Sequence, residues 1–250
     1  MHTKITPSDA LLPPGALATA ARKTVPRRAK GKVVVSWTGG KDGCFAGYQA
    51  LLNGFEVTYL LNFKDLKKAA PHNLNKDLLF AQSEAIGIPL LYSGFVSFEA
   101  EFKRVVRDLN SSGAGIDGAV FGHIAMHEHL VTRICAELGL TLYVPFWKHN
   151  TEQLLSEFID AGFEAIIAST KADMLGEVWL GRKLDSDFLH DLRSMKPTID
   201  PCGEYGEFHT FVIDGPLFKN RIAIHETEKR LENGYWFLDI TDYSIERKAC

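Results

Sequence analysis

The stretch VVVSWTGGKDGCFAGYQALL, Val33–Leu52, joins a short apolar run to a glycine turn and an apolar-periodic segment. Three adjacent valines are typical of a buried strand, and apolar residues recur at helical spacing from Gly43 to Asn53. Adjacent glycines let a backbone approach an anion closely. The free N–H groups at a helix N-terminus attract negative charge. The pattern therefore predicts a phosphate site, with Lys41 adding a positive charge at its rim.

Asp42 is unexpected in a site for anions alone. A carboxylate fits there if Mg²⁺ accompanies the phosphates, because this ion prefers oxygen ligands. We therefore expect Asp42 to be a metal ligand. The predicted nucleotide-binding residues are Ser36, Thr38, Gly39, Gly40, Lys41, Asp42 and Gly43.

Two familiar nucleotide motifs are absent from this turn. It contains neither G-x-x-x-x-G-K-[ST] nor G-x-G-x-x-G, so a Walker loop and a dinucleotide fold are not indicated. The alternative interpretation is an ordinary tight turn between a strand and a helix. The Lys-Asp pair between a predicted strand and a predicted helix favours phosphate binding.

Beyond this turn, β-branched runs alternate with amphipathic segments. Such alternation predicts βαβ units and a five-stranded parallel sheet with helices on both faces. The expected strands are 33–36, 55–63, 88–93, 118–122 and 140–146. The expected helices are 43–53, 73–87, 98–109 and 127–138, with stops at Asn53-Gly54, Gly87 and Gly139.

After Trp147 the regular alternation of strand-like and helix-like segments ends. A helix capped at Asn150 or Thr151 and a strand are expected over 150–170, a helix over Lys183–Arg193, and strands within 200–218 and 235–246. These features predict a second, smaller mixed α/β domain. The predicted organisation is a flexible basic arm at 1–30, a phosphate-binding domain at 31–148 and a C-terminal domain at 149–250.

The composition narrows the class of protein. A net charge of -3 does not favour a nucleic-acid partner. No apolar run is long enough to span a membrane, and the N-terminus lacks the apolar core of a signal peptide. The four cysteines form no CxxC pair, which indicates the reducing cytoplasm rather than a disulfide or zinc scaffold. The sequence leaves the oligomeric state open, including a homo-oligomer.

A second cluster of chemical groups lies at Asp200–Phe218. On a strand after Gly206, the side chains of Glu207 and His209 would share one face. A carboxylate and an imidazole so placed could bind an amine or a metal, or transfer a proton. The alternative is a charged, solvated hairpin.

The motif TGGKDG resembles the SGGKDS loop of the N-type ATP pyrophosphatases, with Thr38 and Gly43 at the two serine positions. CGEYGEFHTF, Cys202–Phe211, resembles the C-terminal signature of the diphthine–ammonia ligase family, and DGPLF after it continues the match. AQSEAIGIPL (81–90), VFGHI (120–124) and LYVPFW (142–147) also resemble segments of that family. The resemblance covers nearly all of residues 32–218.

The resemblance implies an ATP-dependent amide-forming ligase with a Rossmann-like fold, an ATP-binding phosphate-loop domain at 31–148 and a substrate-binding domain at 149–250. A substrate carboxylate would attack the α-phosphate of ATP, releasing pyrophosphate, and ammonia would then displace AMP. It implies ATP and ammonium as substrates, Mg²⁺ as cofactor, and diphthine on elongation factor 2 as the acceptor. The implied catalytic residues are Lys41, Asp42, Glu204, Glu207 and His209. The implied substrate-binding residues are His123, Gly203, Glu204, Tyr205, Gly206, Glu207, His209 and Thr210.

Three residues depart from the family pattern. Gly43 lacks a hydroxyl, His123 replaces an aspartate and Tyr205 replaces a smaller residue. These changes leave two alternatives open, a related enzyme for another carboxylate or modified nucleoside, and a non-catalytic nucleotide-binding regulator. His123, His127 and His129 could also hold a metal, but a polar helix surface explains them without further ligands.

Overall fold

The computed structural model describes residues 30–67, 74–122, 124 and 127–248. Within them the chain divides into two compact units that are not continuous in sequence. One comprises the described residues up to Trp37 together with 45–67 and 88–148. The other comprises 38–44, 74–87 and 149–248. The predicted division at residue 148 stays a prediction, and the predicted basic arm lies, except for Lys30, outside the described residues.

The first unit is built on a parallel sheet in the order β3-β2-β1-β4-β5, which confirms the predicted Rossmann-like class. Its strands are β1 (Lys32–Ser36), β2 (Glu56–Asp65), β3 (Leu90–Phe95), β4 (Ile116–Val120) and β5 (Thr141–Tyr143). The strands carry continuous apolar runs because helices cover both faces of such a sheet. Its helices are α2 (Lys41–Leu52), whose first residues belong to the other unit, α4 (Phe98–Ser111) and α5 (Glu128–Leu138).

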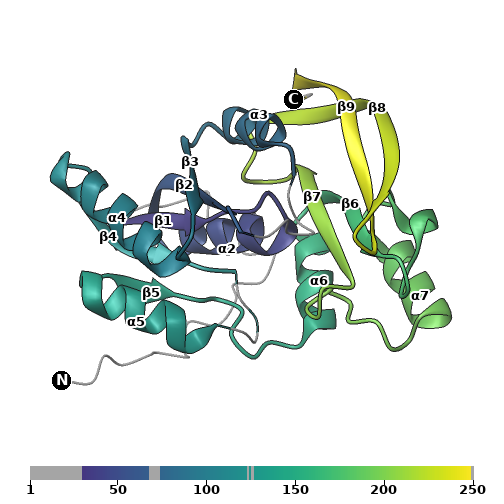
Figure 1. The fold of residues 1–250 in the computed structure, drawn as a ribbon, viewed down its shortest axis with the longest axis horizontal. Helices are drawn as coiled ribbons and strands as arrows, with labels where there is room; N and C mark the ends of the chain where they lie inside the picture. The colour runs from purple at the N-terminus through teal and green to yellow at the C-terminus, as the bar shows by residue number, and fades with distance from the viewer. Residues whose placement is uncertain (1–29, 68–73, 123, 125–126, 249–250) are drawn as a thin grey trace, which may run out of the picture. The chain divides into compact units, whose positions relative to one another are not determined.

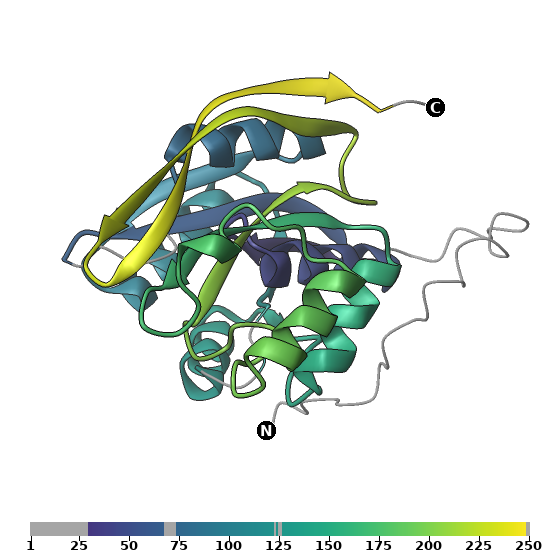
Figure 2. The same ribbon diagram turned by 90° about the vertical axis from the view of Figure 1, so that its right-hand side faces the viewer.

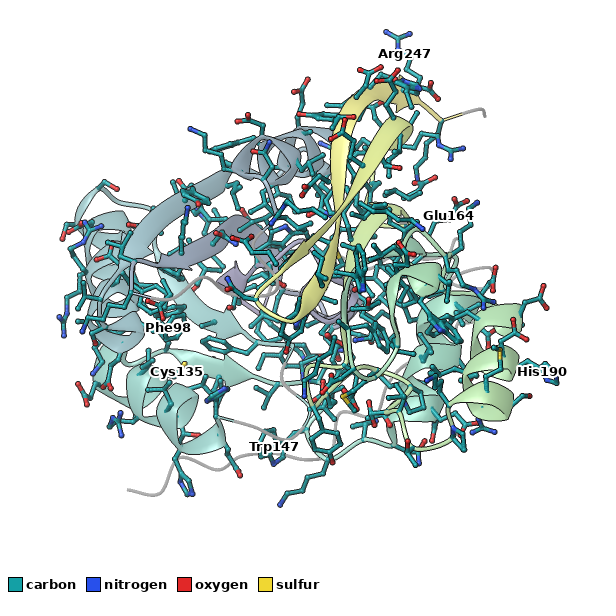
Figure 3. The ribbon with its side chains drawn as sticks, turned by 45° about the vertical axis from the view of Figure 1, so that its right-hand side comes forward. Phe98, Cys135, Trp147, Glu164, His190 and Arg247 are labelled. Carbon is teal, nitrogen blue, oxygen red and sulfur yellow. The ribbon has the colours of Figure 1, made fainter. Side chains whose placement is uncertain are left out.

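Helices α4 and α5 cover one face of this sheet side by side (Figure 1). Their buried side chains include Phe102, Val106 and Ile134. Figure 3 labels Phe98 of α4 and Cys135 of α5, which belong to this layer. On the other face, Gly47 of α2 lies against β1, since a Cβ there would be 3.7 Å from a methyl of Val35.

The second unit contains an antiparallel sheet in the order β7-β6-β9-β8. Its elements are α3 (Lys76–Ile86), α6 (Thr151–Asp160), β6 (Glu164–Lys171), the 3-10 turn η1 (Glu177–Trp179), α7 (Ser186–Met195), β7 (Phe208–Asp214), β8 (Asn220–Glu232) and β9 (Tyr235–Arg247). Figure 2 shows β8 and β9 as a long hairpin, and α6 beside α7, where Arg193 pairs with Glu152. The hairpin ends at the exposed Arg247 (Figure 3).

Local sequence signals set most helix ends. The side chain of Asn150 accepts a hydrogen bond from the N–H of Gln153 at 3.0 Å, which confirms it as the N-cap of α6. Gly87 and Gly139 end α3 and α5 in the left-handed conformation, as predicted. Among the described residues, no helix is long and apolar enough to cross a membrane.

The sequence-based interpretation was wrong at two places. Helix α7 begins at Ser186 rather than Lys183, because Lys183 pairs with Ile166 of β6 and Asp185 caps the helix through the N–H of Phe188. Strand β8 was not predicted. About half of its residues are charged and most are exposed, so no alternation of buried and polar positions marks it.

We predict that Phe102→Ala lowers the free energy of unfolding by about 3–5 kcal/mol, the range for removing a buried aromatic ring. The ring of Phe102 is fully buried and lies 5.5 Å, centre to centre, from that of Phe121. Denaturant unfolding measures the change. Arg107→Ala, at an exposed position of the same helix, is the control and should change stability by less than about 0.5 kcal/mol. Equal effects would contradict the core assignment.

Candidate active site

The second unit contains a cavity of about 390 Å³. One wall is the glycine loop at 38–42, and a second is the segment 202–203 with the first residues of β7. The start of α3, β6 at Ala168 and Ser169, and β9 from Phe237 to Thr241 complete the lining. The two motifs that stand far apart in the sequence therefore meet at one cavity.

The backbone of the glycine loop at Gly39 is one that favours glycine. Gly39 has a φ of +82°, and a Cβ there would lie 2.7 Å from a methyl of Leu79. A Cβ on Gly40 would lie 3.2 Å from the carbonyl oxygen of Thr210. The loop thus runs close to both α3 and β7.

Hydrogen bonds attach this loop to β7. The N–H of Val212 donates to the carbonyl of Gly39 at 3.0 Å. The N–H of Lys41 donates to the hydroxyl of Thr210 at 3.0 Å. The position of the loop is therefore set by a strand about 170 residues further along the chain.

Lys41 is the best-buried charge of the cavity, with 4% of its surface exposed. Its ammonium lies 2.9 Å from each carboxylate oxygen of Asp42 and donates to the carbonyl of Cys202 at 2.5 Å. Burial lowers the pKa of Lys41, but nearby negative charge, chiefly that of Asp42, outweighs this and holds the pKa above its usual value. Lys41 is therefore a cation at neutral pH.

The carboxylate of Asp42 also lines the cavity, with 35% of its side chain exposed. It offers oxygen ligands beside a loop suited to phosphate, which fits the way proteins bind Mg²⁺ with one or two carboxylates and substrate phosphates. The predicted metal role of Asp42 is therefore compatible with its place. Within the described residues, no group of three or more His, Cys, Asp or Glu side chains could hold a metal by itself.

The buried carboxylate of Glu207, a residue that is 1% exposed, binds the backbone of the loop from Asp200 to Gly206. The carboxylate of Glu207 accepts hydrogen bonds from the N–H groups of Asp200 at 3.2 Å and Tyr205 at 2.9 Å. Its carboxylate is thus directed at the backbone of the loop, while His209 lines the cavity. The predicted joint role of these two side chains stays a prediction.

Glu204 is half-buried in the same loop. Burial raises the pKa of Glu204 to about 7, and the charge of Asp42 adds to this effect. Lys41 acts in the opposite direction. A carboxyl group that titrates near neutrality can both accept and donate a proton at physiological pH.

Cys202 is not suited to be a nucleophile. Its thiol donates to the carbonyl of Thr151 at 3.1 Å, and burial raises its pKa to about 12. A protonated thiol reacts poorly because the thiolate is the nucleophile. Its carbonyl accepts the hydrogen bond from the ammonium of Lys41.

The structure brings part of the predicted set to the cavity. Lining it are Thr38, Gly40, Lys41, Asp42, Gly203, His209 and Thr210. Glu204, Tyr205, Gly206 and Glu207 lie in the adjoining loop, with Tyr205 80% exposed. Gly39 belongs to the glycine loop but does not line the cavity. Gly43 is buried in α2, and Ser36 ends β1 in the first unit. His123 lies outside the described residues, and the roles of all these residues stay predictions.

Sequence reasoning missed the wall formed by β9. Phe237 and Asp239 line the cavity, and Asp239 pairs with Arg230 at 2.7 Å. Their segment, YWFLDITDYSIE, alternates as any antiparallel strand does. No local signal distinguishes a residue that faces a cavity from one that faces a core.

The fold places the chain among α/β proteins with a Rossmann-like parallel sheet. Residues 31–142 match the diphthamide synthase N-terminal domain, and residues 150–249 match the diphthamide synthase C-terminal domain. The diphthine–ammonia ligase of Danio rerio is 30% identical over 230 residues, covering 79% of this chain and 88% of that protein. The human diphthine–ammonia ligase is 26% identical over 225 residues, covering 79% and 84%.

These similarities place the chain in a defined enzyme class, the ATP-dependent ligases. The chain belongs to the diphthamide synthase family.

We predict that Glu207→Gln lowers the free energy of unfolding by about 1–3 kcal/mol. The amide can accept only one of the two loop N–H bonds and leaves a buried donor unsatisfied. Denaturant unfolding is the measurement, with Glu226→Gln at an exposed position of β8 as control. A loss no larger than that of the control would mean that Glu207 does not hold the loop.

Proposed function

We propose that this chain adenylates the carboxylate of diphthine on elongation factor 2 and then transfers ammonia to it. ATP would lose pyrophosphate as the acyl-adenylate forms, and ammonia would displace AMP to leave the amide. The observation that carries the proposal is the hydrogen bond between Lys41 of the glycine loop and the carbonyl of Cys202. It joins a phosphate-type loop to a loop with a carboxyl group that titrates near neutrality.

On the phosphate side, the N–H groups of Gly39, Gly40 and residue 43 would hold the β- and γ-phosphates with the ammonium of Lys41. Asp42 would contribute a carboxylate ligand to Mg²⁺, whose charge offsets that of the phosphates. Gly43 offers only its N–H where the resembled motif has a hydroxyl. The lost hydrogen bond costs about 0.5–1.5 kcal/mol, which weakens binding without removing it.

The ammonium of Lys41 would also couple the two loops. It divides its donors between Asp42 and Cys202, and bound phosphates would compete for it. A change in the position of the ammonium would alter the pKa of Glu204, because the charge of Lys41 lowers that pKa. Nucleotide binding would in this way change the pKa of the carboxyl group that is proposed to take the proton from ammonia.

On the acceptor side, Glu204 would take the proton that ammonia loses when it attacks the acyl carbon. His209 lines the same cavity and would contact the acceptor. Glu207 would act indirectly, by fixing the backbone of the loop through its two hydrogen bonds. The exposed ring of Tyr205 would meet the acceptor protein.

The partners follow from this reaction. Ammonium and ATP would be the small substrates, and elongation factor 2 the protein substrate in the cytoplasm. The described cysteines Cys44, Cys135 and Cys202 are free and buried. Free thiols fit the reducing cytoplasm proposed for the protein.

Pyrophosphate release with ATP, ammonium and unamidated elongation factor 2 tests the proposal directly. We predict that Lys41→Met reduces the rate at least about 100-fold, the scale of removing one donor from a developing anion. The matched control is Lys229→Met, at an exposed position of β8. Undiminished release by folded Lys41→Met would contradict the phosphate role. An absence of release by the wild-type chain when ATP, ammonium and unamidated elongation factor 2 are all present would contradict the reaction.

We predict that kcat/KM for ammonia rises with pH through about 7, because Glu204 can accept a proton only when ionised. Rates are expressed per concentration of free ammonia, which removes the ionisation of ammonium itself. Glu204→Gln should lose this inflection, whereas Glu228→Gln at an exposed site should keep it. A profile that Glu204→Gln leaves unchanged would assign the proton to another group.

A further inference from the structure

Gln82 is a fully buried amide of α3, whose other buried residues are apolar except for Ser83. Its Nε2 donates to the carbonyl of Gly39 at 3.0 Å and to the carbonyl of Val212 at 2.7 Å. One side chain of α3 thus bonds both the glycine loop and β7. It does not line the cavity.

These contacts close a network of three segments. The N–H of Val212 donates to the same carbonyl of Gly39 that Gln82 reaches. Strand β7 is an edge strand of its sheet, where carbonyl groups lack a neighbouring strand on one side. Gln82 supplies the missing donor to Val212, so the edge strand and the loop share one buried partner.

The direction of the Gly39 carbonyl decides where the next N–H points. A trans peptide unit is planar, with its C=O and N–H on opposite sides. The carbonyl of Gly39 is held towards Gln82 and Val212, so the N–H of Gly40 is turned away from them. Gly40 itself lines the cavity.

The geometry points to Gln82 as a positioning residue for phosphate binding, acting through the peptide between Gly39 and Gly40. A carbonyl turned into the cavity would repel a phosphate, whereas an N–H attracts it. This inference rests on the proposed phosphate role of the loop and assigns its orientation to α3. Gln82 makes no contact with the ligand.

Two variants separate the donor from the shape of the side chain. Gln82→Glu keeps the shape but places an acceptor against two carbonyl groups, and Gln82→Met keeps the length without a donor. Each should raise the Kd for ATP and for inorganic pyrophosphate, measured by calorimetry, at least about tenfold. In turnover, the KM for ATP should rise while the KM for ammonia stays within about twofold, as a local effect on phosphate binding requires.

The controls lie on the same helix. Ile86→Val trims a buried side chain of α3 without touching the loop, and Glu84→Gln changes an exposed charge. Both should bind pyrophosphate like the wild-type chain. If Ile86→Val loses as much stability as Gln82→Met and also binds equally weakly, the effect is general destabilisation and the inference is wrong.

The remaining outcomes are also decisive. Wild-type affinity in folded Gln82→Glu and Gln82→Met overturns the inference but leaves the proposed function intact. A wild-type chain that binds neither ATP nor pyrophosphate overturns both. If one of the two variants does not fold, the other decides. Gln82→Asn keeps the amide but shortens its reach, and it should raise the Kd for pyrophosphate by a factor between those of the wild-type chain and Gln82→Met.

Discussion

The buried ammonium of Lys41 is the constraint on which the site depends. A charge removed from water is costly unless it is paired and hydrogen-bonded. Lys41 meets this requirement with the carboxylate of its neighbour, Asp42, and the carbonyl of Cys202. Because one partner is adjacent in sequence and the other is 161 residues away, the same ammonium holds two distant loops at one cavity.

The glycine loop belongs structurally with β7 and α3 rather than with the strand that precedes it. Gly39 and Lys41 bond Val212 and Thr210, and Gln82 bonds Gly39 from the helix. The loop can approach these neighbours because Gly39 and Gly40 have no Cβ. This explains physically why the TGGKDG and CGEYGEFHTF motifs occur together, since each completes the surroundings of the other.

The two glutamates of the second motif show how environment separates residues of one type. The carboxylate of Glu207 accepts hydrogen bonds from two backbone N–H groups and fixes the loop from Asp200 to Gly206. Glu204, three residues earlier, is half-buried near Asp42, so its pKa rises to about 7. Their spacing in the sequence suggests similar roles, but burial and hydrogen-bond partners assign them different ones.

Local signals were sufficient for the parallel sheet. Valine-rich runs, helical periodicity and stops such as Gly87 and Gly139 depend on neighbours in sequence, and the structure has them where they were predicted. The charged strand β8 and the start of α7 could not be predicted, because pairing with β9 and the bridge from Lys183 to Ile166 depend on distant partners. His123 lies outside the described residues, so its predicted role stays a prediction.

By itself, the sequence determined the fold class, the glycine loop with its Lys-Asp pair and the resemblance to a ligase family. These follow from residue type and spacing along the chain. Only the tertiary structure decided that Gln82 orients the loop, that Glu207 supports a backbone and that β9 forms a wall of the cavity. Each of those roles depends on hydrogen bonds or packing between segments far apart in sequence, which periodicity does not encode.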